Sequence, residues 1–347
     1  MKSVRRLSNF FAATAVAALF PVAAGAIELG DAVELHGYGH AGALATSTNS
    51  YLKADSSGTL DYYDIALLFT GTLSERAKVW AQLYAIYGEP RLDWAFFDYE
   101  FQNGITLKVG QIKTPFGVYN EIRDIEYLRP SSLKPLMYHD GVDLVDEAFR
   151  GLSLSTSRNF PAGTLAVDLY GGKIVMFEED EHIHGPTFGI HAKWQPADSP
   201  LAIGISAYNT QITDHETGAK DHRNTASLST EFEHAGIRLK SEYVAAKSNE
   251  QEIAAFYLQS DVSLNDRLTP FARIEAITFD GWSSKDLAST QKVISLGLGY
   301  RFTDTWSARL ETHYNHGYAL PIKTEAIEAV DAKPNWFLYA LSFNFVF

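Results

Sequence analysis

The fold is decided by the C-terminal stretch Phe337-Leu338-Tyr339-Ala340-Leu341-Ser342-Phe343-Asn344-Phe345-Val346-Phe347. Every second residue of this stretch is aromatic or leucine, and Ser342 and Asn344 lie between them. Successive side chains of a β-strand point to opposite faces, so one face of this strand is apolar and the other is partly polar. The pattern predicts a strand that has lipid on one face and water on the other.

The same alternation repeats along the chain, and helical periodicity is nearly absent. Arg238, Lys240 and Glu242 share the inner face of one strand, and a packed core would bury these charges at a cost of several kcal/mol each. A watery interior avoids that cost. Strands are predicted at residues 33–46, 60–73, 77–87, 92–101, 105–113, 151–158, 164–173, 186–194, 201–209, 225–233, 237–246, 251–264, 268–279, 291–302, 306–316 and 335–347.

These segments number sixteen, an even number, as a closed antiparallel barrel with both ends on one side requires. The fold class is therefore an all-β transmembrane barrel. The N-terminus resembles an export signal: Lys2, Arg5 and Arg6 are basic, residues 10–20 are apolar, and small residues 24–26 form a cleavage site. Residues 1–26 are predicted to be a signal peptide and residues 27–347 a single barrel domain. No later window offers the ~20 apolar residues of a spanning helix.

Composition excludes several functions. The chain has no cysteine, so thiol chemistry and disulfides are absent. Its formal charge is −13, and removal of three basic signal residues takes it to −16, which argues against nucleic acid as a partner. The 13% aromatic content fits girdles at two membrane interfaces. The expected partners are outer-membrane lipid, lipopolysaccharide, and small hydrophilic solutes or ions. No cofactor or metal is expected.

One early connection is long, residues 114–150, and it would be the third on the extracellular side. It begins with Gly110-Gln111-Ile112-Lys113-Thr114-Pro115-Phe116-Gly117 and continues to Tyr127-Leu128-Arg129-Pro130. These segments resemble those of proteobacterial porins related to the phosphate-selective porin O/P group. The resemblance is strong over residues 109–130 only. It implies a sixteen-stranded barrel, usually a homotrimer, whose third loop folds into the lumen and sets the constriction.

The chain departs from the anion-selective members of that group, because by parity eight inward basic residues face ten inward acids. Phosphate selectivity is therefore in doubt, and the acids of the long connection favour a weak preference for cations. Fixed charges tune selectivity because a pore with low-dielectric walls focuses their field on passing ions. The residues predicted to form the constriction and the pore lining are Lys108, Lys113, Tyr119, Glu121, Arg123, Asp124, Glu126, Arg129, Lys134, Arg238, Lys240, Arg273, Arg301 and Arg309.

Two further sequence patterns resemble binding sites, one for a dinucleotide and one for a divalent cation. Gly37-Tyr38-Gly39-His40-Ala41-Gly42 matches a dinucleotide fingerprint, but no helix follows it, so the glycines are predicted to lie on the first strand. The run Glu178-Glu179-Asp180-Glu181-His182-Ile183-His184 could bind a divalent cation, although a solvated charge run is the simpler interpretation.

The sequence predicts a passive diffusion channel that is not an enzyme. The motifs Gly-x-Ser-x-Gly and His-Glu-x-x-His are absent. Two alternatives stay open: an outer-membrane enzyme, which would pair a Ser or Asp with a His, and an adhesin or structural barrel plugged by its loops.

Overall fold

The structure is a computed structural model that describes residues 27–28, 32–86, 88–139, 142, 144–175, 182–214, 220–249, 251–281, 285–325, 328 and 330–347. The predicted signal peptide and the acidic run Glu178-Glu179-Asp180-Glu181 lie outside the described residues.

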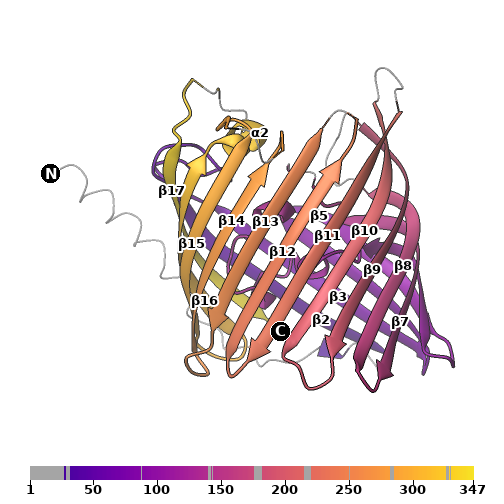
Figure 1. Cartoon of the computed structure of the whole chain (residues 1–347). Coiled ribbons are helices and arrows are strands. Elements are labelled where there is room, and N and C mark those ends of the chain that lie inside the picture. The colour runs from indigo at the N-terminus through magenta and orange to yellow at the C-terminus, as the bar shows by residue number, and fades with distance from the viewer. Residues whose placement is uncertain are drawn as a thin grey trace.

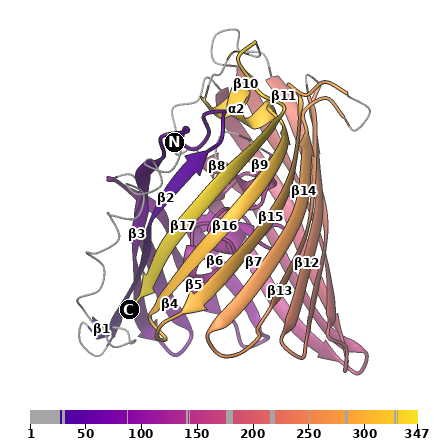
Figure 2. The ribbon, with the colours of Figure 1, turned by 90° about the vertical axis from the view of Figure 1, so that its left-hand side faces the viewer.

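The chain forms a closed antiparallel barrel of sixteen strands, β2 to β17, which confirms the predicted fold class (Figure 1). β17 pairs with β2, for example Leu341 with Ala43, and this ladder closes the barrel (Figure 2). The two-residue strand β1 pairs with β2 beyond the end of that ladder. The strands are β1 Ile27–Glu28, β2 Val33–Thr46, β3 Thr59–Ser74, β4 Ala77–Ile86, β5 Glu89–Glu100, β6 Ile105–Lys113, β7 Ala148–Phe160, β8 Gly163–Val175, β9 His182–Pro196, β10 Leu201–Asp214, β11 Lys220–His234, β12 Ile237–Lys247, β13 Glu252–Val262, β14 Leu268–Thr278, β15 Thr290–Arg301, β16 Trp306–Gly317 and β17 Asn335–Val346.

The two faces of the sheet differ as the alternation predicts. On β15, Ile294, Leu296 and Leu298 are exposed on the outside, whereas Ser295 between them is buried. On the outside of a transmembrane barrel such residues meet lipid, and their burial in hydrocarbon stabilises the inserted protein.

Short turns join the strands at one end of the barrel, at the bottom in Figure 1, and longer connections lie at the other end. The last connection holds the helix α2, Ala319–Glu325, which the sequence reading did not predict. The predicted connection 114–150 is shorter than expected, because β7 begins at Ala148 and pairs this residue with Lys113. No helix among the described residues is long and apolar enough to cross a membrane.

The glycines of the dinucleotide-like motif lie on β2, as predicted. A Cβ atom at Gly42 would lie 2.3 Å from the carbonyl oxygen of Leu341, and one at Gly39 would lie 2.6 Å from that of Asp64. These glycines therefore permit the close approach of neighbouring strands.

Candidate channel constriction

The long connection between β6 and β7, residues 114–147, is called the long loop below. It contains three short 3-10 helices: η1 Asn120–Ile122, η2 Glu126–Leu128 and η3 Leu136–Tyr138. Phe116, Tyr119, Tyr138 and Leu144 are almost completely buried. A loop on the surface would expose such side chains. The burial of these four therefore indicates that the long loop packs against the barrel.

Three glutamates of the inner face anchor the loop on one side of the barrel, and they come from the alternate strands β12, β14 and β16. Glu242 accepts hydrogen bonds of 2.8 Å from the Tyr138 hydroxyl. Glu275 accepts one of 2.7 Å from the backbone N–H of Leu136. Glu311 accepts one of 2.6 Å from the backbone N–H of Ser132 and one of 2.8 Å from the Ser131 hydroxyl. All three carboxylates are therefore occupied by the loop.

Two arginines of the predicted lining lie on the same side, and they too are buried against the loop. Arg273 of β14 forms an ion pair of 2.9 Å with Glu275 and donates to the carbonyl oxygens of Leu133 and Lys134. Arg309 of β16 donates to the carbonyl oxygen of Tyr127. Both guanidinium groups thus satisfy loop carbonyls.

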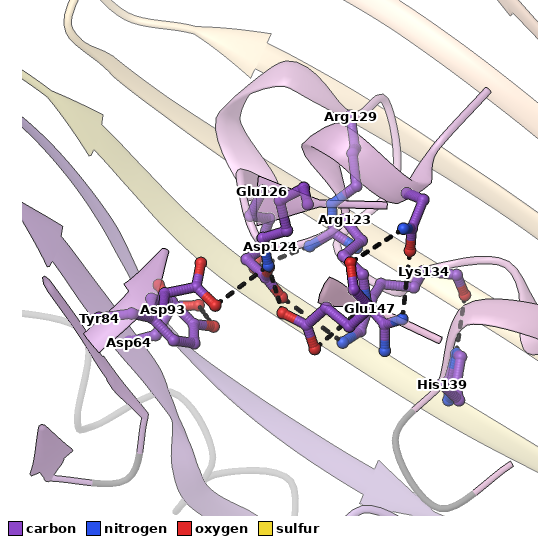
Figure 3. A network of polar contacts seen from close by, with 12 residues as sticks. Asp64, Tyr84, Asp93, Arg123, Asp124, Glu126, Arg129, Lys134, His139 and Glu147 are labelled. Carbon is purple, nitrogen blue, oxygen red and sulfur yellow. Dashed lines mark hydrogen bonds and ion pairs between the residues drawn. The ribbon is translucent and has the colours of Figure 1, made fainter. Parts of the chain in front are cut away.

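On the opposite side, the ammonium group of Lys113 lies among three carboxylates, those of Asp93, Asp124 and Glu147, which Figure 3 labels. It contacts Asp93 of β5 at 3.1 Å, and also Asp124 and Glu147 of the loop. The carboxylate oxygens lie within 4.8 Å of one another, the arrangement of a cation site, and the Lys113 ammonium occupies this place. Burial opposes the charge of Asp124, but the ammonium groups of Lys113 and Lys134 hold its pKa far below the ordinary value.

A second ionic cluster joins the loop to β2 and β3. His40 of β2 lies 2.9 Å from Asp64 of β3 and 2.8 Å from Glu126 of the loop. Tyr84 of β4 donates a 2.7 Å hydrogen bond to Asp64. Burial opposes the charge of Glu126, but His40 and nearby arginines lower its pKa to about 2. The loop is therefore held by charged contacts on two sides of the barrel.

A small cavity of about 70 Å³ remains between the loop and the wall of β2 to β4. Arg129 lines it and is 6% exposed, and its Nε and Nη1 have no hydrogen-bond partner among the described residues. Arg129 Nη2 forms an ion pair of 3.9 Å with Glu126. The cavity is lined by His40, Leu52, Tyr62, Asp64, Tyr84, Arg123, Asp124, Arg129, Ser132, Leu133, Lys134 and His139.

The other predicted lining residues are dispersed. Arg238 and Lys240 of β12 are half-buried; Arg238 pairs with Asp261 at 2.5 Å, and Lys240 lies over the ring of Tyr119. Lys108 is half-buried over the Phe96 ring, and Glu121 is exposed on the loop. Arg301 is exposed beside the β13–β14 turn, where it donates to the carbonyl oxygen of Asp266 at 2.8 Å. Burial raises the pKa of Tyr119 to about 12. The structure places Arg123, Asp124, Arg129 and Lys134 around the cavity and leaves Lys108, Glu121 and Arg301 apart from it.

The alternation of inward and outward side chains did not predict one residue of the site, Asp93. The pairing of β4 with β5 shifts between Gln82 and Leu83, and Leu92 and Trp94 lie opposite them with Asp93 left over. This β-bulge turns Asp93 toward the inner face, where Gln82 donates to it at 2.7 Å. Strict alternation places an odd-numbered residue of β5 on the lipid face, so only the pairing register discloses it.

The inner wall also contains a chain of Ser, His and Glu. The Ser295 hydroxyl lies 2.7 Å from His313 Nδ1, and His313 Nε2 lies 3.2 Å from Glu311. Ser295 is completely buried, and Glu311 is shared with the long loop. The order Ser, His, acid is that of a hydrolytic triad, but here Nδ1 of His313 faces the serine and Nε2 faces the acid, the reverse of the triad arrangement. His313 Nε2 also has no hydrogen-bond partner among the described residues.

No protein-family model and no curated protein sequence matches the chain. Among solved structures it is similar to an anion-selective porin from Comamonas acidovorans, with a TM-score of 0.63 and 11% identity, over 91% of this chain and 99% of that one. Salmonella typhi OmpF in complex with daunomycin gives a TM-score of 0.61 and 12% identity, over 93% and 100%. The trimer form of OmpT, an outer membrane protein of Vibrio cholerae, gives 0.60 and 11%, over 91% and 100%. The chain therefore has the fold of outer-membrane porins.

Proposed function

We propose that the chain forms a water-filled channel in the bacterial outer membrane through which small hydrophilic solutes and ions diffuse passively. The observation that carries the proposal is the set of contacts that bind the long loop to side chains of the barrel strands. Glu242, Glu275 and Glu311 bind it at β12, β14 and β16. On the opposite side, Lys113 at the end of β6 binds Asp124 and Glu147 of the loop, and Asp93 of β5 pairs with that lysine. A segment tied to the inner wall from two sides narrows the passage and sets the charge that a solute meets.

The charge around the cavity favours anions over cations. Asp124 and Glu126 are compensated by Lys113 and His40, whereas the Arg129 guanidinium keeps two nitrogens without a hydrogen-bond partner among the described residues. This proposal differs from the weak cation preference that the acidic residues indicate by number, because paired acids contribute little field. The resemblance over residues 109–130 makes inorganic phosphate the first anion to test.

Reversal potentials in planar bilayers test the channel and its selectivity together. Stepwise openings with a potential that favours chloride over potassium are expected, and Arg129→Glu should shift the potential toward cations. Arg158→Glu, an exposed residue at the other end of β7, is the matched control and should leave it unchanged. Closed traces would contradict the channel, and an unchanged potential in Arg129→Glu would remove the loop from the constriction.

Export through the signal peptide at residues 1–26 and assembly into a homotrimer belong to the same proposal. The trimer form of one structural neighbour supports the assembly. Chemical cross-linking of the detergent-purified protein should give a three-chain product, and N-terminal sequencing should begin at Ile27. A single-chain product at all cross-linker concentrations would contradict the trimer.

The chain of Ser295, His313 and Glu311 favours a second candidate function, hydrolysis. A fluorophosphonate probe labels a serine only when the serine is activated and reachable. We expect no labelling, because the serine is completely buried. Labelling that Ser295→Ala abolishes would establish the enzyme instead.

A further inference from the structure

The outer face of the barrel has a polar site at the edge of its apolar surface, at the extracellular ends of β6, β7 and β8. Arg150 of β7 and Lys173 of β8 are directly opposite each other in the ladder, and both are exposed. They share the outward face with Leu152 and Leu154, which are 53% and 45% exposed. Like charges directly opposite in a ladder repel each other, so the pair destabilises the sheet unless an anion lies nearby.

The described residues supply no acid for these cations. Arg150 donates a 2.9 Å hydrogen bond to the neutral amide oxygen of Gln111. Among the described residues, neither Arg150 nor Lys173 has an ion pair. The negative charge that compensates Arg150 and Lys173 therefore comes from outside the described residues.

A groove of about 570 Å³ has Arg150 in its lining. It exists because β5 and β6 separate: their ladder ends at Ala95 and Gln111, and the Gln111 amide then donates to the carbonyl oxygens of Leu92 and Asp93. Its lining combines small residues with the apolar side chains of Leu92, Val109 and Leu152. The groove is lined by Leu92, Ala95, Val109, Gly110, Gln111, Arg150, Gly151 and Leu152.

The position of Arg150 along β7 corresponds to the level of the outer-leaflet head groups. Arg158, the next outward cation on the same strand, is eight residues away. Eight residues at ~3.4 Å each, tilted by ~40°, span roughly 21 Å along the membrane normal, close to the ~25 Å apolar band of such barrels. Arg150 and Arg158 thus mark the two edges of the band, and Leu152, Leu154 and Thr156 point outward between them.

We propose that this site binds a phosphorylated glycolipid of the outer leaflet. A phosphate group lies between Arg150 and Lys173, the Gln111 side chain orients the arginine, and one acyl chain occupies the groove. Charge complementarity identifies this occupant: an amphiphile with a dianionic head above an apolar chain matches a pair of cations above an apolar groove. The inference rests on the outer-membrane location and is independent of the channel.

Native mass spectrometry of the detergent-purified mature protein tests it, with bisphosphorylated lipid A as the probe and its dephosphorylated form as the control lipid. The wild-type protein should retain the phosphorylated lipid, and the double variant Arg150→Gln/Lys173→Gln should bind it about tenfold more weakly or worse, since charge-assisted hydrogen bonds are lost. Lys292→Gln, an exposed outward lysine of β15, is the matched control and should bind as the wild type does.

Equal binding of the two lipids, or unchanged binding in the double variant, would overturn the inference. If free inorganic phosphate displaced the lipid completely, the claim that an acyl chain occupies the groove would be wrong. If the double variant loses its oligomeric state while each chain keeps its lipid, a second copy of the chain occupies the site, and the inference is also wrong. The gel mobility of the folded barrel shows that the variant is intact, and its unchanged conductance separates this result from a failure of the proposed channel.

Discussion

Replacement of Lys113 by alanine should release the long loop. The lysine ammonium is buried and is the shared partner of Asp93, Asp124 and Glu147, whose oxygens lie within 4.8 Å of one another. Removing one partner of a buried ion pair costs about 3–5 kcal/mol. Because every 1.4 kcal/mol is tenfold in an equilibrium constant, the docked loop should lose a factor of roughly 10² to 4 × 10³ in population relative to undocked states.

The assay is single-channel recording in planar bilayers with EDTA present. Lys113→Ala should give a larger and noisier conductance than the wild type, because the constriction opens when the loop leaves its seat. Millimolar Ca²⁺ should restore the smaller conductance, since three convergent carboxylates are the hard oxygen ligands that this cation prefers. Lys113→Arg keeps the charge and should behave nearly as the wild type does.

The matched control is Lys108→Ala, on the same strand, because Lys108 has no ion pair among the described residues. A conductance of Lys113→Ala equal to that of the wild type in EDTA would refute the reasoning, since the cluster would then not hold the loop. A Ca²⁺ effect of equal size on the wild type would place the ion elsewhere.

Three further changes probe the loop. Gly117 has a φ of +60°, and a Cβ there would lie 1.8 Å from Glu242. Gly117→Ala should therefore destabilise the docked loop by about 1–3 kcal/mol and speed its proteolysis. An unchanged cleavage rate would contradict this. Tyr138→Phe leaves Glu242 without its 2.8 Å donor, and the urea midpoint should fall by the equivalent of about 1–3 kcal/mol; no fall would mean that water replaces the hydroxyl. Glu126 has its pKa lowered from 4.5 to about 2, so its stabilisation is complete above pH 4.5 and is lost as the pH falls toward 2. Conductance should therefore stay constant from pH 7 to about pH 5, and a transition inside that range would point to another group.

The number of strands and the direction of most side chains were predictable from the sequence. Arg238, Glu242, Ser295 and Arg309 all have the inward orientation that alternation assigns to them. This succeeds because the period of two is a property of the extended backbone itself and needs no partner strand. The same local rule gave β17 and its apolar face.

Only the tertiary structure decided which charged side chains face water and which are bound by other groups of the protein. Asp93 turns inward through a bulge whose existence depends on the register against β4. Glu311 is an anchor because Ser132, 179 residues earlier in the chain, lies beside it. Arg273 is buried for the same reason, because loop carbonyls cover it. Contacts at such separations follow from barrel closure and loop packing, and no local pattern in the sequence encodes them.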